Sequence, residues 1–318
     1  MLVAWDVHLA RRYACVDDIL PYSDFDRVFF KACRELVANH CGHPGPRIEV
    51  SERTPHPVVS ELKRETQAEV VCERDGIDSF LSALRSVKDQ SEVEYLRQAC
   101  RITNEMLTAL TSLIHERRKE LTELDLALFI EKEARQRGGE TVGFETLVAC
   151  PQRSYAIHPF PAYTGCAFSG AGLSLLDFGV QYCGYTSDVT VPVIQHPLSK
   201  GQTALLETVL GAYDLALTGM RKRRTGRAIA ESVEGLMRQA GYSMPHSLGH
   251  GIGLNAHEQP ILSVKAQGQE LRPGMVFTVE PGLYDASEGG IRLENDILVT
   301  ENGYEVLTEA KPIVVPGH

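Results

Sequence analysis

Two acidic residues lie inside apolar, β-rich runs of the sequence. Asp177 lies in LLDFG and Asp188 in TSDVTVPV, and the runs Leu173–Val180 and Tyr185–Ile194 flank a glycine-containing turn, which predicts a hairpin. Acids are depleted from strand interiors because an unpaired buried carboxylate is costly. A bound cation would stabilise both acids, and we expect further ligands to converge on this pair.

A glycine-rich segment and two later β-rich runs supply the further candidates. The segment PHSLGHGIGLNAHEQP contains His246, His250 and His257, and its glycines allow the backbone to approach a crowded site. Glu280 ends the apolar run MVFTVE, and Glu294 lies in the apolar run GGIRLENDILVT, which is expected to form another strand. Four acids in four apolar strands, together with a histidine among glycines, predict one shared site.

This donor set predicts a dinuclear metal site. Four carboxylates in one cleft of low dielectric constant repel one another, and two divalent cations would balance their charge. A single Zn²⁺ ion on three histidines would not need so many acids, and an all-oxygen Ca²⁺ site would not need His250. Four oxygen donors and one imidazole suit Mn²⁺, Co²⁺, Fe²⁺ or Zn²⁺. Two such ions, about 3.5 Å apart, would hold a bridging hydroxide that attacks an amide carbonyl, so hydrolysis is the expected reaction class.

The elements around these residues follow one order twice. A long amphipathic helix is expected to begin at Ser91, with Glu94 in the capping-box position, and a second helix is expected at Leu124–Arg137. After the hairpin, helices are expected at Ser199–Leu217 and Thr225–Ala240, again followed by β-rich runs with acids. The repeated order predicts an α+β fold of two pseudo-symmetric halves around a shared cleft.

The first part of the chain has a different character. Residues 1–85 alternate candidate helices, such as Asp24–Asn39, with candidate strands, such as Ala68–Cys72. We expect a small α/β domain there and a second, site-bearing domain in residues 86–318. The chain of 318 residues, 43% of them hydrophobic, is long enough for both.

Composition and charge restrict the partners and the location. The net charge is −10, from 32 basic and 42 acidic residues, and there is no long basic stretch, so we expect no nucleic-acid partner. The densest basic cluster, Arg221–Arg224, is expected to be a solvated helix end. Eight cysteines without a CxxC pair are expected to be reduced thiols. There is no signal-like apolar segment and no run of membrane-spanning length, so a cytoplasmic protein without a membrane partner is expected.

Taken together, these motifs resemble the pita-bread metallopeptidases, which include methionine aminopeptidase, aminopeptidase P and prolidase. The resemblance covers roughly residues 85–315 and rests on the order of the candidate ligands and on the segments SLGHGIGLNAHE, TVEPGLY and GGIRLEND. The short interval between Glu280 and Glu294, a leading extra domain and an RxVKxxxE-like start favour the aminopeptidase P and prolidase branch. That start comprises Arg85, Val87, Lys88 and Glu92.

The resemblance implies a role for each matching residue. Asp177 would bind one metal ion, Asp188 and Glu294 would bridge both ions, and His250 and Glu280 would complete the shell of the first ion. Glu280 also matches the family's candidate general base. The other matching residues would line the substrate site, stabilise the tetrahedral intermediate or hold carboxylates in place: His158 and His246 line the site, His257 contacts substrate and intermediate, and Arg292 holds the carboxylates.

The sequence also departs from this family's pattern. Val191 stands where an arginine is common, and the loop before His158 carries Pro151, Arg153 and Ile157 where glycine and asparagine are usual. The leading domain is shorter than this branch usually shows. These differences support an alternative, a C–N hydrolase of a small non-peptide amide or amidine. A second alternative is a non-catalytic binding protein, although such relatives usually lack ligands that this chain retains.

From these features we expect a metallopeptidase with two divalent ions per chain, Mn²⁺ being favoured over Co²⁺, Zn²⁺ or Fe²⁺. It would remove an N-terminal residue that precedes proline, from dipeptides or short peptides. An Xaa-Pro bond is a tertiary amide, which general peptidases cleave poorly, so a dedicated enzyme is reasonable. The family resemblance also implies a homodimer.

Overall fold

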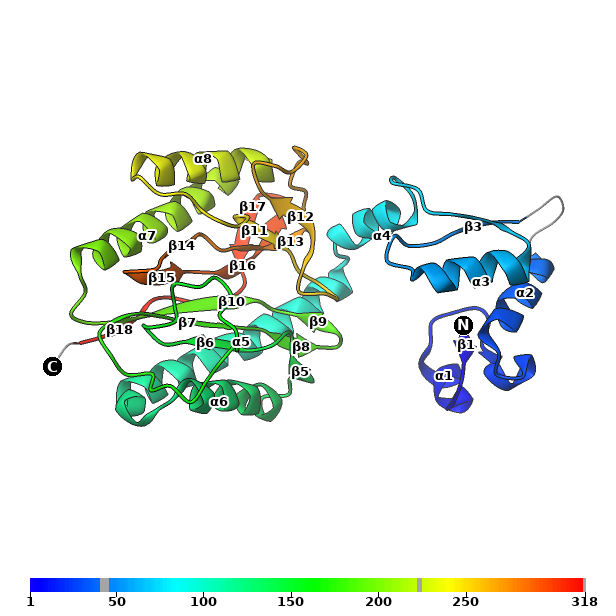
Figure 1. Cartoon of the computed structure of the whole chain (residues 1–318), viewed down its shortest axis with the longest axis horizontal. Helices are drawn as coiled ribbons and strands as arrows, with labels where there is room; N and C mark the ends of the chain where they lie inside the picture. Colours follow the sequence, from blue (N-terminus) through cyan, green and yellow to red (C-terminus); the bar gives the residue numbers. More distant parts are fainter. Residues whose placement is uncertain (41–45, 222–224, 317–318) are drawn as a thin grey trace. The chain divides into compact units, whose positions relative to one another are not determined.

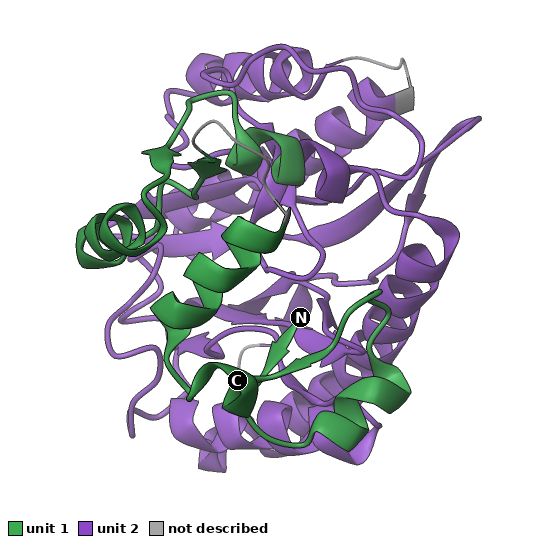
Figure 2. Cartoon of the chain, turned by 90° about the vertical axis from the view of Figure 1, so that its right-hand side faces the viewer, with its two compact units in different colours: residues 1–82 green, residues 83–318 purple. Residues whose placement is uncertain are grey.

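The computed structural model describes residues 1–40, 46–221 and 225–316. The chain divides into two compact units, Met1–Ser82 and Ala83–His318, which are coloured separately in Figure 2. Part of the basic cluster, residues 222–224, and the cysteine at position 41 lie outside the described residues. The seven cysteines within them are free thiols, as expected.

Unit 1 mixes short strands with helices, in agreement with the α/β character expected of this part of the chain. Two pairs of parallel strands lie in it, with helices between the members of each pair. Its elements are β1 (Leu2–Val3), α1 (Val7–Tyr13), β2 (Leu20–Pro21), η1 (Tyr22–Phe25), α2 (Phe29–His40), β3 (Arg47–Glu49), α3 (His56–Thr66) and β4 (Glu69–Val71). The single helix expected at Asp24–Asn39 is wrong at its start, because Asp26 and Arg27 adopt left-handed backbone conformations (φ 54° and 58°) that separate η1 from α2.

Unit 2 contains two main sheets, each with its own pair of helices (Figure 1). The four-stranded sheet has the order β18-β10-β7-β6, and the five-stranded sheet has the order β12-β11-β13-β16-β17. Helices α5 and α6 pack on strands of the first half, and α7 and α8 on strands of the second half. The two-half α+β architecture expected from the sequence is therefore present. Among the described residues, no helix combines the length and the apolar character that crossing a bilayer requires.

The bounds of these elements are as follows. Helix α4 (Ile77–Ser86) includes the division between the units, and the helices of unit 2 are α5 (Gln90–Arg117), η2 (Arg118–Glu120), α6 (Glu123–Gln136), α7 (Lys200–Arg221) and α8 (Gly226–Gln239). The first-half strands are β5 (Thr141–Val142), β6 (Leu147–Ala149), β7 (Gly172–Phe178), β8 (Val180–Tyr182), β9 (Tyr185–Thr186) and β10 (Val189–Gln195). The later strands are β11 (Gly249–Gly251), β12 (Glu258–Leu262), β13 (Val276–Val279), β14 (Gly282–Asp285), β15 (Gly289–Arg292), β16 (Asn295–Thr300), β17 (Gly303–Val306) and β18 (Ile313–Val315).

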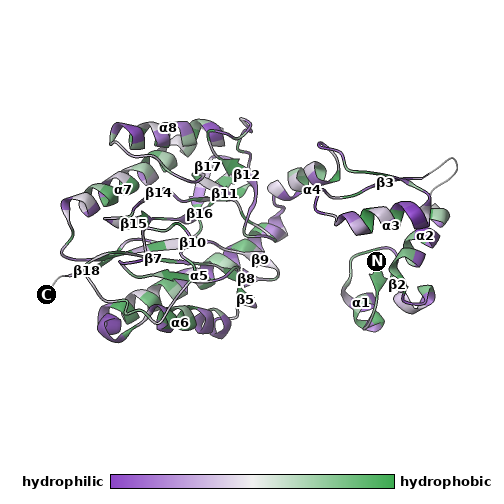
Figure 3. Ribbon diagram, viewed as in Figure 1, coloured by the Kyte–Doolittle hydropathy of each residue, from purple (hydrophilic) through white to green (hydrophobic). Residues whose placement is uncertain are grey.

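Helices α5, α6 and α8 of unit 2 begin where side chains cap them, with one correction to the sequence analysis. Helix α5 starts at Gln90, and its capping box is formed by Asp89 and Glu92 rather than by Ser91 and Glu94. Both pairs have the required spacing, and an N-cap at Asp89 adds two residues to the helix. Helix α8 is capped by Thr225, and its buried residues recur at helical spacing. Figure 3 shows hydrophobic and hydrophilic residues on the same helices, as expected for amphipathic segments.

The predicted hairpin is interrupted in both of its strands. Strands β7 and β10 pair along their whole length, whereas β8 and β9 pair with each other and join β5 in a separate sheet. At the interruption the Ser187 hydroxyl accepts a hydrogen bond from the Val180 amide at 2.9 Å. A side chain thus replaces the backbone carbonyl that would accept this bond in a regular ladder. Two continuous strands were therefore the wrong expectation, although the order of pairing was correct.

The buried strand β7 explains why an acid lies in an apolar run. All seven of its residues are buried, because the main core with its helices lies against one face and the β14–β15 pair covers the other. Leu176 and Phe178 pack into the main core, whereas Leu175 packs with Leu147 and Ala149 on the opposite face. Since side chains alternate between faces, Asp177 shares the face of Leu175. It is thereby directed toward the second half of the unit.

Candidate metal centre

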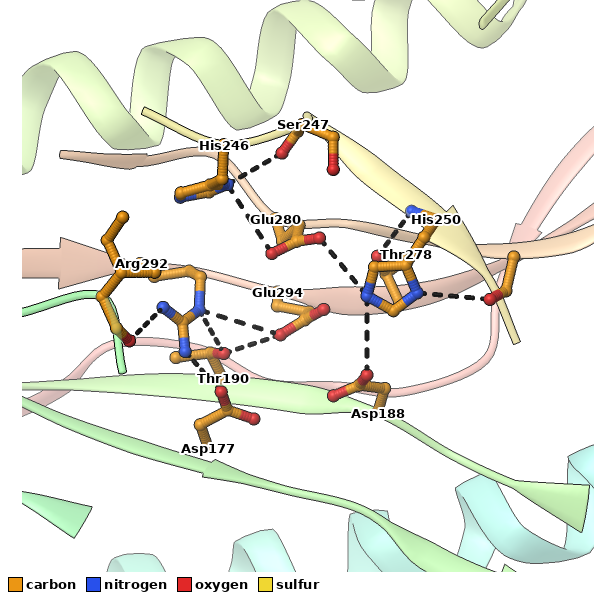
Figure 4. A network of polar contacts seen from close by, with 12 residues as sticks. Asp177, Asp188, Thr190, His246, Ser247, His250, Thr278, Glu280, Arg292 and Glu294 are labelled. Atoms are coloured by element: carbon orange, nitrogen blue, oxygen red, sulfur yellow. Dashed lines mark hydrogen bonds and ion pairs between the residues drawn. The ribbon is translucent and has the colours of Figure 1, made fainter. Parts of the chain in front are cut away.

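One cavity of about 240 Å³ lies between the two halves of unit 2 and collects the residues predicted to form the site. Figure 4 shows most of them directed toward one another from both sheets. The cavity lining includes Asp177, Asp188, His250, Glu280, Glu294, His158, His246, His257 and Arg292. The tertiary structure therefore brings together all nine residues, although they span 137 positions of the sequence from first to last.

Three of the four acids lie beside strands rather than inside them, which agrees with the expectation for Glu280 at the end of its run but corrects it for Asp188 and Glu294. Asp177 is within β7, but Asp188 precedes β10, Glu280 follows β13 and Glu294 separates β15 from β16. At each of these positions the backbone amide bonds outside the regular ladder: Asp188 N donates to Asp296 Oδ2, Glu280 N to Leu248 O and Glu294 N to Thr190 O. Strand ends leave a carboxylate free to point across the cleft, whereas a strand interior restricts it to one face.

The backbone around His250 approaches neighbouring strands so closely that only glycine fits beside it. A Cβ atom on Gly249 would lie 1.9 Å from Thr278 O, and one on Gly251 would lie 2.1 Å from Gln259 O. The glycines on each side of His250 therefore let β11 pack between β12 and β13. They hold the imidazole in the middle of the second sheet, at the cavity wall.

The His250 ring is oriented for metal binding through Nε2. Its Nδ1 atom donates to the Gly251 carbonyl at 3.2 Å, which leaves the Nε2 lone pair directed into the cavity. Nε2 lies 3.4 Å from Glu280 Oε1 and 3.8 Å from Asp188 Oδ2. One donor atom from each of Asp188, His250 and Glu294 lies within 4.8 Å of the others. These distances leave room for a cation between the donor atoms.

Arg292 connects the carboxylates of the two halves (Figure 4). Its Nη2 atom donates to Asp177 Oδ2 and its Nε atom donates to Thr190 Oγ1 at 2.8 Å. The Thr190 hydroxyl in turn donates to Glu294 Oε2 at 2.6 Å. Arg292 is 2% exposed, so its charge acts on these acids with little screening by water. One guanidinium faces four carboxylates, which leaves the cluster strongly acidic.

The protonation of the acids shows that they require further positive charge. Burial, reinforced by neighbouring acids, raises the pKa of Asp188 and of Glu280 well above the usual range and that of Glu294 to about 7. Asp177 Oδ1 is buried and has no hydrogen-bond partner among the described residues. Bound cations would satisfy that oxygen and keep all four groups ionised. The donor set therefore fits the dinuclear site that the sequence predicts.

Three histidines of the cavity, His246, His250 and His257, have lowered pKa values that favour the neutral imidazole. Burial lowers the pKa of both His246 and His250 to about 4, and that of His257 is also lowered by burial. The His250 and His257 rings stack with their centroids 3.9 Å apart and their planes at 25°. Neutral imidazoles at neutral pH keep a lone pair for a metal ion or for a substrate hydrogen bond.

The other predicted substrate contacts lie on the cavity wall away from the His250 face. His246 Nδ1 donates to the Ser247 carbonyl at 2.8 Å, and its Nε2 atom accepts from the Tyr284 hydroxyl at 3.2 Å. His158 lines the cavity on the loop after β6, beside Ile157. The Ile157 carbonyl accepts from Arg292 Nη1, which ties this loop to the acid cluster.

Three polar residues of the site were missed in the sequence analysis. Tyr284 accepts from Arg292 Nη1 at 2.6 Å, Thr190 links Arg292 to Glu294, and the Thr278 hydroxyl accepts from the His250 amide at 3.2 Å. Thr190 follows Asp188 by two positions, and Thr278 precedes Glu280 by two. That spacing places both threonines on the site face of a strand, and it was the available signal.

Two departures from the family pattern prove to lie outside the cavity. Val191 is 1% exposed and belongs to the main hydrophobic core, because it faces away from Thr190. Arg153 forms an ion pair with the fully buried Glu123 rather than lining the site. Of the substituted loop residues, only Ile157 reaches the cavity. The support for a non-peptide substrate is thus largely removed.

Glu123 anchors the loop that carries His158. Its carboxylate accepts from the Cys150 amide at 2.8 Å, from the Thr164 amide at 2.8 Å and from the Thr164 hydroxyl at 2.6 Å, in addition to Arg153. These bonds join both ends of the loop to the first turn of α6. The sequence showed Glu123 only as a residue near a helix start.

Comparison with known proteins identifies similar chains. Residues 94–301 match the model of metallopeptidase family M24. The Xaa-Pro dipeptidase of Pyrococcus horikoshii is 29% identical over 92% of this chain and 79% of its own length. The Xaa-Pro dipeptidase of Pyrococcus furiosus is 31% identical over 74% of this chain and 66% of its own length. A solved Xaa-Pro dipeptidase from Bacillus anthracis covers 99% of this chain and 86% of its own, with a TM-score of 0.87 and 27% identity.

Proposed function

This chain belongs to metallopeptidase family M24 and has its pita-bread fold, and we propose that it is a dinuclear metal-dependent hydrolase of the Xaa-Pro bond in dipeptides or short peptides. The observation that carries the proposal is the convergence of four buried carboxylates and the Nε2 face of His250 on one cavity. The similarity to Xaa-Pro dipeptidases supports the choice of substrate.

We propose that Asp177 and Asp188 hold the cations from the first half, and that His250, Glu280 and Glu294 hold them from the second. In this assignment Asp188 and Glu294 would be the carboxylates that both ions share, as the family resemblance implies. Bound divalent cations would polarise the scissile carbonyl and supply a water that ionises near neutral pH. The chain's own contribution is to fix the ligands: Gly251 sets the tautomer of His250, and Arg292 orients Asp177.

Proton transfer is assigned to Glu280. Its carboxylate reaches into the cavity from the end of β13, with Oε1 beside His250 and Oε2 3.8 Å from His246 Nδ1. A carboxylate at this position can take a proton from the attacking water and deliver it to the leaving nitrogen. The leaving nitrogen of an Xaa-Pro bond has no hydrogen of its own, so it must receive one for the proline to depart.

Substrate contacts are assigned to His158, His246 and His257. As a neutral imidazole, His257 can donate a hydrogen bond to the oxygen that gains charge as the carbonyl becomes tetrahedral. His158 and His246 line the substrate space together with an apolar wall. The apolar wall residues are Phe144, Leu147, Ile157 and Ile261. Such a wall suits a proline ring, which carries no amide hydrogen to satisfy.

The proposal is tested by assaying Xaa-Pro dipeptides and tripeptides with the purified chain, with and without Mn²⁺ and chelator. We expect proline release that depends on the metal and is lost in Glu280→Gln. A matched series of Xaa-Ala peptides controls for specificity. Absence of turnover on every Xaa-Pro peptide with each of Mn²⁺, Co²⁺, Zn²⁺ and Fe²⁺ would reject the proposal.

Four finer assignments are proposed on the family resemblance of the sequence. The native metal is Mn²⁺, the chain forms a homodimer, it acts in the cytoplasm, and residues 1–85 form a shortened N-terminal domain before a catalytic domain of residues 86–318. The oxygen-rich donor set supports Mn²⁺. Metal analysis of protein purified without added ions, and light scattering in solution, test the first two assignments.

A further inference from the structure

A buried ion cluster lies at the start of helix α5, beside the metal centre but outside its ligand set. Arg85 and Lys88 both bind the Glu258 carboxylate: Arg85 Nη2 contacts Oε1, and Lys88 Nζ lies 3.3 Å from Oε2. The side chains of Lys88 and Glu258 are 1% and 5% exposed, and that of Arg85 is 33% exposed. Water therefore hardly reaches the Lys88–Glu258 pair, so each of these two charges depends on the other, and the partly exposed Arg85 adds a second cation to the same carboxylate.

This cluster is connected directly to His257. Glu258 is the next residue in the chain, and its Oε1 atom accepts from the Asn255 amide at 3.0 Å. A Cβ atom on Gly253 would lie 2.6 Å from Glu258 Oε2, so the loop 253–257 folds tightly over the carboxylate. The His257 ring leaves this loop to stack on His250. Glu258 therefore holds the loop at the end that carries His257.

Lys88 is itself held by the fold rather than by its charge alone. Its amide donates to Gly274 O at 2.9 Å, and the preceding residue Val87 forms an isolated antiparallel β-bridge with Met275, directly before β13. Burial lowers the pKa of Lys88, while Glu258 opposes that shift. The buried Lys88 ammonium donates its hydrogen bond to Glu258 and not to a carboxylate of the metal centre. It therefore stabilises the loop that carries His257 rather than the metal ligands.

The same helix start also reaches the other half of the site. Glu92 caps α5 through Oε2 and accepts from the Tyr185 hydroxyl at 2.8 Å through Oε1. Tyr185 lies on β9, which leads into Asp188, and Thr186 N donates to Gly253 O at 2.9 Å. Residues 85–92 thus contact both the histidine loop and the hairpin that supplies Asp188.

We propose that Arg85, Lys88 and Glu258 form a positioning clamp that holds His257 against His250, without binding metal or substrate themselves. The inference rests on the proposed function, because His257 matters for catalysis only if the cavity hydrolyses a peptide bond. The clamp holds the backbone of the loop 253–257 through Glu258, and the stacked His250 ring holds the His257 ring on the cavity side. Loosening the clamp should release His257 while the metal ligands stay in place.

The test is Lys88→Met in the full-length, metal-loaded enzyme, compared with wild type on an Xaa-Pro dipeptide. We expect kcat to fall about 10-fold or more, with KM and metal content changed by less than about twofold. An activity-independent measurement is the rate at which diethyl pyrocarbonate modifies His257, normalised to the exposed His196 in the same protein. We expect that ratio to rise several-fold in the variant.

Two further variants keep the result interpretable. Arg97→Met breaks another ion pair of α5, with Glu305, and is expected to leave kcat and the His257 ratio unchanged. Lys88→Met/Glu258→Gln removes both buried partners, so it remains testable if the single variant does not fold, and it should show the same rise in His257 reactivity. Lys88→Arg retains the charge and should recover part of kcat.

The two proposals fail in different ways. If wild type cleaves Xaa-Pro dipeptides and Lys88→Met keeps both kcat and the His257 ratio, the clamp is overturned. If the variant loses thermal stability alone, with kcat at 25 °C and His257 reactivity unchanged, Lys88 is merely structural and the clamp is again overturned. If wild type cleaves no Xaa-Pro peptide but the His257 ratio still rises in the variant, the proposed function fails and the clamp stands.

Discussion

At the residue scale, the site is defined by acids whose burial is costly without a cation. Asp188, Glu280 and Glu294 all have raised pKa values, because burial and mutual repulsion disfavour their charged forms. Arg292 offsets part of this repulsion through Asp177 and Thr190. The repulsion among these acids lowers the stability of the metal-free chain, and the same negative charge increases the affinity for divalent ions.

The variant Asp188→Asn should show both effects, on metal affinity and on the stability of the metal-free chain. We expect the variant to lose metal and to lose more than about 100-fold in kcat, because one bridging oxygen donor is replaced by an amide. The metal-free variant should nevertheless be more stable than metal-free wild type at pH 7, since it lacks a buried charge. Metal analysis and thermal unfolding measure the two effects. Asp285→Asn, at an exposed acid of the same unit, should leave the metal content unchanged.

The raised pKa of Glu294 predicts how the stability of the metal-free chain changes with pH. Its pKa is raised from about 4.5 to about 7 by burial and by Asp177, so the folded state binds its proton more tightly than the unfolded state. The stability of the metal-free chain should therefore fall as pH rises from 4.5 through 7 and level off above that.

The comparison that isolates this group is metal-free wild type against metal-free Glu294→Gln across pH 5 to 8. Both proteins contain the same buried histidines, so the difference reports on Glu294 and on Asp188 and Glu280, whose pKa values, already raised by burial, its charge helps to raise. Wild type should lose stability relative to the variant as pH increases. A stability difference that is flat with pH, or a wild type that gains stability relative to the variant as pH increases, would contradict the assignment.

At the element scale, interruptions in strands direct the acids into the cavity. The hairpin breaks before Asp188, and the later β-rich run breaks at Glu294, where β15 ends and β16 begins. Each break replaces ladder hydrogen bonds by bonds to Asp296 or Thr190. Loops are positioned in a similar way, since Glu123 holds both ends of the segment that bears His158.

Glu123→Ala should therefore impair substrate binding more than metal binding. Removing the carboxylate leaves Arg153 and two backbone amides without their buried partner, at a cost of about 3 to 5 kcal/mol in the free energy of unfolding. We expect KM to rise with metal content unchanged. Lys132→Ala, at an exposed position of the same helix, is the control and should behave as wild type. Unchanged KM in Glu123→Ala would show that the loop holds its position without this anchor.

At the scale of the whole molecule, the metal centre lies where the two halves of unit 2 meet. Asp177 and Asp188 come from the four-stranded half, and His250, Glu280 and Glu294 come from the half built on β11, β13 and β16. Because the ligands come from both halves, a bound metal ion would link the two halves of unit 2 to each other.

Metal should accordingly stabilise the whole of unit 2 rather than a single loop. At 100 times the dissociation constant, one bound ion adds about 2.7 kcal/mol to the free energy of unfolding. Hydrogen exchange with and without Mn²⁺ should show slower exchange in both β10 and β13 when metal is present. Protection restricted to one half would indicate that the ligands do not span the interface.

Much of this protein was determined by the sequence itself. The residue types of the site and the order of helices and strands in each half follow from local pattern and composition. Local signals suffice there because caps, amphipathic stripes and turns depend on residues only a few positions apart. The resemblance to a metallopeptidase family was readable for the same reason, since each motif is short.

The tertiary structure alone decided where the strands break and which polar side chains support the ligands. Glu294 was expected inside a strand, because an apolar run looks continuous until its partner strand is known. Tyr284 and Lys88 lie in segments that the sequence singles out, but no local signal indicated their partners Arg292 and Glu258, which lie 8 and 170 positions away. Buried charges of this kind are set by which elements meet in space, and that is a property of the packed fold.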